Sequence, residues 1–116
     1  MLSLGRRGER KAAAFLKRLG MRIIERNYKA PPGEVDIIAM DGETLVFVEV
    51  KARKGDSFGS PLEAVDLRKQ RRITRAALFY MSGLREQPPA RFDVIGVLIR
   101  GWRSEVEHVR DAFALE

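Results

Sequence analysis

Two apolar segments separated by an Asp-Gly pair place the strongest constraint on how this chain can fold. Residues 35–40 (VDIIAM) and 44–52 (TLVFVEVKA) consist mostly of apolar side chains, and Asp41-Gly42 stands between them. Asp-Gly between two such segments is among the best short-range signals of a β-hairpin. The second segment is apolar on both faces, which is typical of a buried, central strand. The sequence therefore predicts a hairpin at the centre of a sheet.

The segments on either side of this hairpin predict two helices and three more strands. Ser60-Pro61-Leu62-Glu63 has the N-cap serine, first-position proline and third-position glutamate of a helix start. The predicted elements, in chain order, are a helix over 5–19 capped by Gly20, strands over 21–28, 35–40 and 44–52, a loop over 53–59, a helix over 60–82, strands over 91–100 and 105–109, and a short final segment over 111–115. This order favours an α/β or α+β fold, a sheet with helices packed on it. A length of 116 residues fits one domain spanning 1–116.

The composition excludes several kinds of chemistry. The chain has no cysteine, which rules out disulfide bonds, thiolate metal ligands and cysteine nucleophiles. His108 is the only histidine, so a histidine-based triad or zinc site has little support. No apolar run approaches the roughly 20 residues of a membrane-spanning helix. The N-terminus turns basic at Arg6, before the apolar region of a signal peptide can form. We expect a soluble cytoplasmic protein with no membrane partner.

The chain is strongly basic, with a formal net charge of +6 and a pI of about 10.2. Its basic side chains form two clusters, the first with Arg6, Arg7, Arg10, Lys11, Lys17 and Arg18, and the second with Arg68, Lys69, Arg71, Arg72 and Arg75. Such a surface suits a polyanion, most commonly a nucleic acid. An ordinary solvated basic surface explains the same clusters, because a high pI is a weak signal by itself.

The predicted hairpin brings charged residues of both strands to one face of the sheet. If the Asp-Gly pair is a two-residue turn, counting back from it places Asp36 opposite Phe47. Facing residues share a side of the sheet, and so do residues two apart on one strand. Asp36, Glu49 and Lys51 then project from one face, with Asp36 and Glu49 as diagonal neighbours roughly 7–8 Å apart. A turn with an odd number of residues would send Asp36 to the other face.

Acidic side chains in such a strand need a compensating partner. Glu49 interrupts an apolar run, and two neighbouring carboxylates repel each other as well as losing hydration. A divalent cation removes both penalties, and Mg²⁺ takes one or two carboxylates together with waters and phosphate oxygens. Lys51 could orient or deprotonate a water molecule, or stabilise charge on a phosphate. The alternative is a structural salt bridge of Lys51 with Asp36 or Glu49.

Glu9 is a candidate third acid, because it extends the apolar stripe of the first predicted helix. Ala12, Ala13 and Leu16 lie at helical spacing from it, so its side is expected to face the sheet. Glu9 could therefore approach the metal site, or it could lie beyond the core and pair with a base such as Arg6.

Two further acids have simpler interpretations. Glu34 would lie opposite Glu49 in the predicted register, either as an outer or second metal ligand or as a solvent-exposed acid. Asp93 interrupts the apolar strand over 91–100, and we expect a structural role for it.

The chain resembles the PD-(D/E)XK nuclease superfamily at its two central segments. Gly33-Glu34-Val35-Asp36 and Phe47-Val48-Glu49-Val50-Lys51-Ala52-Arg53 are similar to the D…(D/E)-x-K signature of that superfamily. Val35 stands where the superfamily has a proline, which is a common departure. Over nearly its full length the chain is also similar to the YraN family of bacterial proteins, and the matching pieces are Gly8-Glu9 with Ala12, Arg26-Asn27-Tyr28, residues 33–36 and 47–53, Lys69 with Arg72-Ile73, and Arg91-Phe92-Asp93.

This resemblance implies a restriction-endonuclease-like fold, close to archaeal Holliday junction resolvases, in which a helix acid, an aspartate and an E-x-K motif bind magnesium and cut DNA. Carried over to this chain, Glu9, Asp36 and Glu49 would bind Mg²⁺ or Mn²⁺, and Lys51 would complete the catalytic set. The residues expected to contact nucleic acid are Arg7, Lys11, Arg53, Lys69, Gln70 and Arg72.

The predicted function is hydrolysis of phosphodiester bonds in DNA, selective for branched or junction structures because phosphate contacts carry no sequence information. The core is too small to enclose a duplex, so a homodimer is compatible with this function. A second hypothesis is a module that binds nucleic acid without cutting it, in DNA repair, recombination or uptake. A third is an interaction protein whose basic surface meets an acidic partner, which leaves an acid such as Glu49 in a buried strand unexplained.

Overall fold

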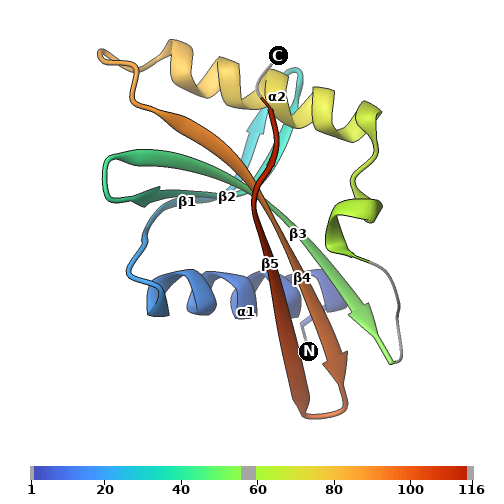
Figure 1. Cartoon of the computed structure of the whole chain (residues 1–116). Coiled ribbons are helices and arrows are strands. Elements are labelled where there is room, and N and C mark those ends of the chain that lie inside the picture. Colours follow the sequence, from blue (N-terminus) through green and yellow to red (C-terminus); the bar gives the residue numbers. More distant parts are fainter. Residues whose placement is uncertain (1, 56–59, 115–116) are drawn as a thin grey trace.

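The computed structural model describes residues 2–55 and 60–114, and its elements follow the predicted order. They are helix α1 (Leu4–Arg18), strands β1 (Arg22–Ala30), β2 (Gly33–Asp41) and β3 (Thr44–Lys54), the short 3₁₀ helix η1 (Pro61–Ala64), helix α2 (Leu67–Ser82), and strands β4 (Ala90–Arg100) and β5 (Arg103–Phe113). The strands form one five-stranded sheet in the order β1-β2-β3-β4-β5, with β3 parallel to β4 and the other neighbours antiparallel. The two helices lie on opposite sides of the sheet (Figure 1), which confirms the predicted α/β architecture. Within the described residues, no helix has the length and apolar character that crossing a membrane requires.

The buried side chains divide into two clusters, one under each helix. Leu16 of α1 packs with Val48 of β3 on one side of the sheet, here called the α1 face. Ile73 and Ala77 of α2 pack with Phe47 of β3 on the other side, the α2 face. Phe47 and Val48 are both fully buried, because successive residues of a strand point to opposite faces. β3 is therefore the central, doubly covered strand that the sequence predicts.

The β2–β3 hairpin forms as expected, but its predicted register is wrong by two residues. The loop consists of residues 42–43 instead of the Asp-Gly pair, so Phe47 lies opposite Ile38 and not opposite Asp36. A shift of two residues leaves the side chains of the paired residues on the faces where they were expected. Its consequence is that Asp36 is level with Glu49 at the end of the ladder, and the two are not diagonal neighbours.

The prediction of a single helix over residues 60–82 is wrong, because the helical conformation is interrupted between η1 and α2. Ser60 caps η1 as predicted, but Val65 leaves the helical region with φ −116° and ψ 88°. Asp66 then starts a new helix, and its side chain accepts a hydrogen bond from the Lys69 N–H at 2.9 Å. Aspartate is favoured at the N-cap of a helix because its carboxylate accepts a hydrogen bond from an otherwise unpaired backbone N–H. The second cap places Lys69 in the first turn of α2.

Other predicted boundaries shift as well. β5 unites the predicted strand 105–109 with most of the predicted final segment 111–115, of which residue 115 lies outside the described part of the chain. The loop predicted over 53–59 starts later, because its first two residues continue β3, and residues 56–59 are not among those described.

Candidate active site

Asp36 lies where β2 and β3 separate. The last backbone pair of this ladder is Ile37 with Val48, and beyond it Asp36 Oδ2 accepts a hydrogen bond from the Val50 N–H at 2.8 Å. Val35 packs on the α2 face although Ile37, two residues later, packs on the α1 face. The regular alternation of β2 is therefore interrupted around Asp36, and its carboxylate sits in the fork between the strands.

Glu49 is the acidic side chain most affected by its surroundings. It has the same orientation as Phe47, towards the α2 face, and its side chain is 13% exposed. Burial raises the pKa of Glu49 to about 8, and the charge of Asp36 and a hydrogen bond between the two carboxyl groups act in the same direction. Lys69 and Lys51 oppose this rise but do not cancel it. Near neutral pH Glu49 therefore keeps its proton or requires a cation.

Two lysines lie beside this acid pair. Lys69 Nζ of α2 is 3.7 Å from Glu49 Oε2. A hydrogen bond with Lys69 and repulsion by its charge lower the pKa of Lys51, and burial adds to this effect. Lys51 also lines a pocket of about 450 Å³ together with Arg53 and Gly96. The acids and both lysines thus form one electrostatically connected centre at the separation of β2 and β3.

Glu9 approaches the same centre from α1. Its neighbour Gly8 makes this possible, because a Cβ at that position would lie 2.5 Å from the Ala52 Cβ on β3. Burial raises the pKa of Glu9, and the charge of Asp36 raises it further. Glu9 Oε1 is buried without a hydrogen-bond partner among the described residues, 3.7 Å from Arg26 Nη2. Glu9 therefore has both of the expected properties, proximity to Asp36 and a pairing with a base, although the base is not Arg6.

The residues that hold Glu9 were not recognised from the sequence. Arg26 and Asn27 of β1 lower the pKa of Glu9, Arg26 by its charge and Asn27 by a side-chain hydrogen bond. Asn27 has a φ of 53°, and it lies between the pairs that β1 makes with Val35 and Ile37. Asparagine is one of the few non-glycine residues that adopt this conformation readily. The signal available in the sequence for this part of the site was an asparagine, Asn27, within an otherwise regular strand.

Oxygen ligands for a hard cation are present, but they are not preassembled. In the described ranges, no three histidine or acidic side chains lie close enough to form a metal site as they stand. Asp36 and Glu49 contact each other, while Glu9 reaches Asp36 through its charge. The donor set of carboxylates suits Mg²⁺ or Mn²⁺ and not a soft metal. The Glu9 oxygen without a hydrogen bond and the raised pKa of Glu49 beside Asp36 both fit a cation at this place.

The other predicted site residues divide between the two faces. Gln70 donates a hydrogen bond to the Val65 carbonyl at 2.9 Å, so its amide stabilises the break before α2. Arg72 and Lys11 are exposed, and Arg53 lines the pocket beside Lys51. Arg7 lies on α1, far from Lys69 on α2. Glu34 is exposed and pairs with Lys29 of β1, and it does not pair with Glu49 because the β2–β3 ladder ends at Ile37. Its exposure agrees with its interpretation as a solvated acid.

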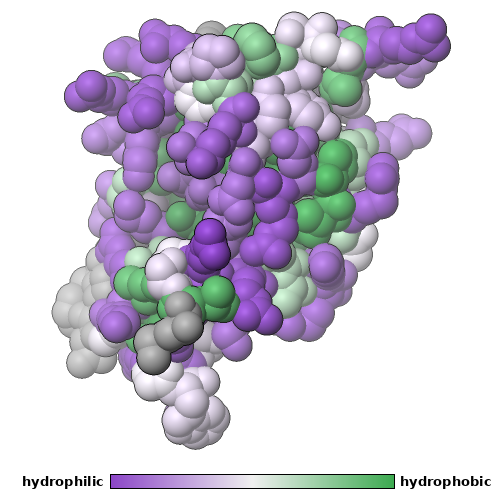
Figure 2. Space-filling model, turned by 180° about the vertical axis from the view of Figure 1, so that it is seen from behind, coloured by the Kyte–Doolittle hydropathy of each residue, from purple (hydrophilic) through white to green (hydrophobic). Residues whose placement is uncertain are grey.

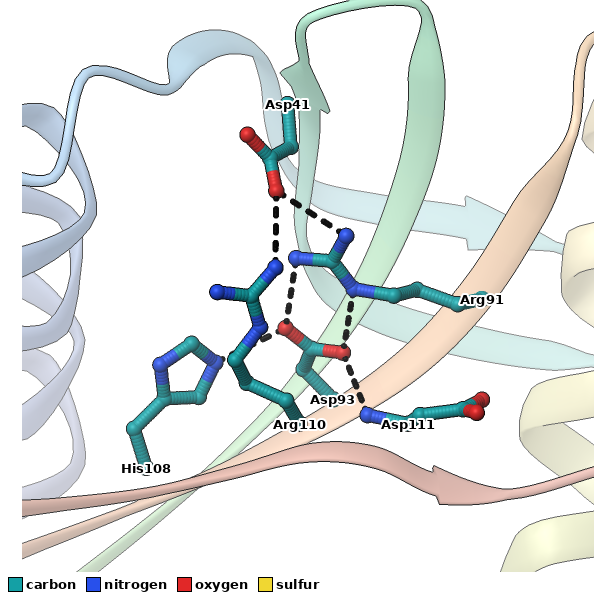
Figure 3. A network of polar contacts seen from close by, with 6 residues as sticks. All are labelled: Asp41, Arg91, Asp93, His108, Arg110 and Asp111. Carbon is teal, nitrogen blue, oxygen red and sulfur yellow. Dashed lines mark hydrogen bonds and ion pairs between the residues drawn. The ribbon is translucent and has the colours of Figure 1, made fainter.

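A second charged cluster surrounds Asp93 and has a different character (Figure 3). The fully buried Asp93 accepts hydrogen bonds from Arg91 at 3.0 Å and from the Asp111 N–H at 3.0 Å, and it lies 2.7 Å from His108 Nε2. Burial tends to raise the pKa of Asp93, but the bonds from His108, Arg91 and Asp111 outweigh it and lower the pKa. Arg91 continues the network to Asp41 at 2.9 Å. Every oxygen of Asp93 is satisfied, which agrees with the structural role expected for it.

The fold and the charged centre together define an α/β protein with a five-stranded mixed sheet, two helices on opposite faces, and acids and lysines at the end of the β2–β3 ladder. The chain belongs to the uncharacterised protein family UPF0102, whose sequence profile matches residues 8–97, and this is the YraN family that the motifs resemble. It is 51% identical to a UPF0102 protein of Syntrophotalea carbinolica over 99% of this chain and 94% of that protein. It is 47% identical to a UPF0102 protein of Chlorobium chlorochromatii (97% and 92% covered) and 50% identical to one of Rhodococcus jostii (97% of each).

Proposed function

We propose that this protein is a metal-dependent endonuclease that hydrolyses phosphodiester bonds in DNA and selects branched or junction structures. The observation that carries the proposal is the contact between the mostly buried Glu49 and Asp36, with Lys51 and Lys69 beside them. Carboxyl pairs with raised pKa values are costly for a fold, and they occur most often where a site uses them. The resemblance of residues 33–36 and 47–53 to the nuclease signature supports the same conclusion.

Asp36 and Glu49 are the proposed ligands of Mg²⁺ or Mn²⁺, with Glu9 in support from α1. When bound, the metal would supply Lewis-acid activation of the scissile phosphate and of the attacking water. The chain itself must prevent the acids from repelling the DNA backbone. Lys69 and Lys51 offset their negative charge at the place where a phosphate would approach. Lys51, whose pKa is lowered by the neighbouring Lys69, is the group proposed to orient the attacking water or to accept its proton.

The basic surface is proposed to hold the DNA backbone. Arg53 and Arg72 extend positive charge from the centre, and Arg7 and Lys11 supply it on the other side of the sheet. Contacts of this kind recognise the shape of the backbone and not its sequence, and they weaken steeply as salt is added. Two copies of so small a domain would suit a branched substrate, and light scattering with and without junction DNA tests that part.

Binding of nucleic acid without cleavage is the second candidate function. One observation favours it: Glu49 is already paired with Lys69, so the acid has a partner without a metal. The same fold would then act in repair, recombination or uptake as a binding module.

The deciding experiment is a cleavage assay on junction, flap, single-stranded and duplex DNA with Mg²⁺ or Mn²⁺. The wild-type protein is compared with Glu49→Gln and with Glu43→Gln, an exposed acid in the β2–β3 loop that serves as the matched control. We expect cleavage of branched DNA by the wild type and the control, and loss by about 10³-fold or more in Glu49→Gln. Equal binding by all three proteins without cleavage by any would favour the second candidate.

Metal binding is measured separately from activity. Mn²⁺ should raise the melting temperature of the wild type and of Glu43→Gln, and it should leave Glu49→Gln nearly unchanged, since a ligand that binds the native state stabilises it. Equal shifts in all three proteins would place the metal elsewhere.

A further inference from the structure

An exposed tryptophan stands at the turn between β4 and β5, outside the acid centre. Trp102 is the only tryptophan in the sequence, and it is 88% exposed. The turn projects from the body of the molecule, at the lower end of Figure 1 and as the pale lobe at the bottom of Figure 2. The guanidinium of Arg103 lies 5.1 Å from the centre of the indole ring. So exposed an aromatic side chain adds nothing to the core, and it is available to a ligand.

A basic groove connects this turn to α1. The groove has a volume of about 700 Å³, and the charged residues that line it are Arg7, Arg10, Lys11 and Arg103. No acidic side chain of the described residues is among its lining. Leu2, Ala14 and Ile99 contribute apolar surface between the cations and the indole. The combination of cationic walls, apolar surface and a free aromatic ring differs from an ordinary solvated helix face.

The groove is held in place by contacts between distant parts of the chain. Arg7 Nη2 donates to the Gly101 carbonyl at 3.4 Å, which joins α1 to the turn. Arg7, Lys11 and Ala14 recur at helical spacing, so they form one side of α1, while Gly8 and Glu9 form the buried side. α1 therefore carries an acid towards the centre and bases towards the groove.

We propose that this groove binds an unpaired segment of DNA, with one base stacked on Trp102 and the neighbouring phosphates contacted by Arg10, Lys11 and Arg103. The inference rests on the proposed function and specifies its substrate: DNA in which at least one strand leaves the duplex. Each base has a flat π face, so stacking on an indole accepts any sequence, and cationic side chains neutralise the adjoining backbone. A base paired within a duplex cannot offer its face to Trp102, which gives the groove a preference for junction arms, flaps and single strands.

The single tryptophan provides a direct test in the intact protein. Its fluorescence is followed during titration with a dT oligonucleotide, an abasic oligonucleotide of the same length and a blunt duplex. We expect strong quenching by the dT strand and little by the other two. The affinities of the variants are measured by the fluorescence anisotropy of a labelled dT strand, because the Trp102 variants contain no tryptophan. Trp102→Ala should bind this strand about tenfold more weakly, and Trp102→Phe should retain most of the affinity. Phe79→Ala, which removes an aromatic ring that is 50% exposed on α2, should bind like the wild type.

The possible results distinguish this inference from the proposed function. Equal affinity for dT and abasic strands, or unchanged dT affinity in Trp102→Ala, would overturn the inference and leave a simple polyanion surface, even if the protein cleaves DNA. Quenching by dT in the wild type and in Glu49→Gln, with no cleavage of any substrate, would support the groove and refute the nuclease. Replacement of Arg10 or Lys11 by Gln should reduce the salt dependence of dT affinity by about one phosphate contact each.

Discussion

The backbone N–H of Val50 donates to Asp36 Oδ2 at 2.8 Å, so a side chain of β2 replaces the backbone acceptor that the ladder no longer offers. This bond fixes the carboxylate between the strands, within reach of Glu49 on one side and of the charge of Glu9 on the other. Asp36 consequently has a structural role and a proposed chemical role, and substitutions can separate them.

Asp36→Asn should keep the fold and lose cleavage, because an amide oxygen can still accept the Val50 N–H but carries no charge. Asp36→Ala should in addition lower the free energy of unfolding by about 1–3 kcal/mol, since it leaves a buried donor unpaired. Urea denaturation of both variants provides the measurement. Equal stability of Asn and Ala variants would contradict the bonding role of this carboxylate.

Glu49 should make the metal-free protein less stable as the pH rises. Burial and Asp36 raise the pKa of Glu49 from its ordinary value of 4.5 to about 8, so the folded state binds the extra proton between these values. Stability is then fully present below the unfolded pKa and is lost as the pH rises through the folded pKa. Glu49→Gln removes this slope, and at pH 8 in EDTA it should be more stable than the wild type by on the order of 2 kcal/mol. A wild-type stability that is flat from pH 5 to pH 8 would contradict the raised pKa.

Gly8→Ala should destabilise the protein by about 1–3 kcal/mol, because the new methyl group meets the Ala52 Cβ. Gly5→Ala is the matched control on the same helix, since nothing lies within 4 Å of a Cβ there, and it should be neutral or slightly stabilising. In a thermal denaturation series, Ala52→Gly should recover most of the loss in the double variant. A Gly8→Ala protein as stable as Gly5→Ala would show that α1 can move away without cost.

Asp93→Ala should lower the unfolding free energy by about 3–5 kcal/mol, because Arg91 and His108 lose a buried partner. The lowered pKa of Asp93 means that its contribution is present above the unfolded pKa and is lost as the pH falls through the folded one. Acid unfolding followed by circular dichroism should therefore begin at higher pH in this variant. Asp111→Asn is the control, because it removes one carboxylate but keeps the backbone N–H that binds Asp93.

The sequence was sufficient for the α/β architecture and for the proximity of Asp36 and Glu49. Period-two alternation, however, cannot distinguish hairpin registers that differ by two residues, since both place the same side chains on the same face. The position of Asp36 level with Glu49 therefore had to come from the structure. So did the interruption of β2, which depends on the left-handed Asn27 across the β1–β2 ladder.

Two other features depend on contacts between distant segments. The basic run of α2 was visible in the sequence, but the break at Val65 and the cap at Asp66 decide that Lys69 is the base that meets Glu49. The groove around Trp102 had no signal beyond a turn between two strands, because its other wall comes from Arg7 and Lys11, more than ninety residues earlier in the chain.

The parallel pairing of β3 with β4 also affects the order in which the elements of the chain fold. Glu9, Asp36, Glu49 and Lys51 all belong to α1 and the first three strands, whose antiparallel pairs are local, whereas Lys69 belongs to the crossover that must come before β4. On the ribosome the N-terminal part of the chain emerges first, and local contacts form fastest. The acids can therefore meet before α2, which carries Lys69, has folded. Glu49 and Asp36 then come together before the charge of Lys69 is added, and Lys51 of β3 is the base already beside them.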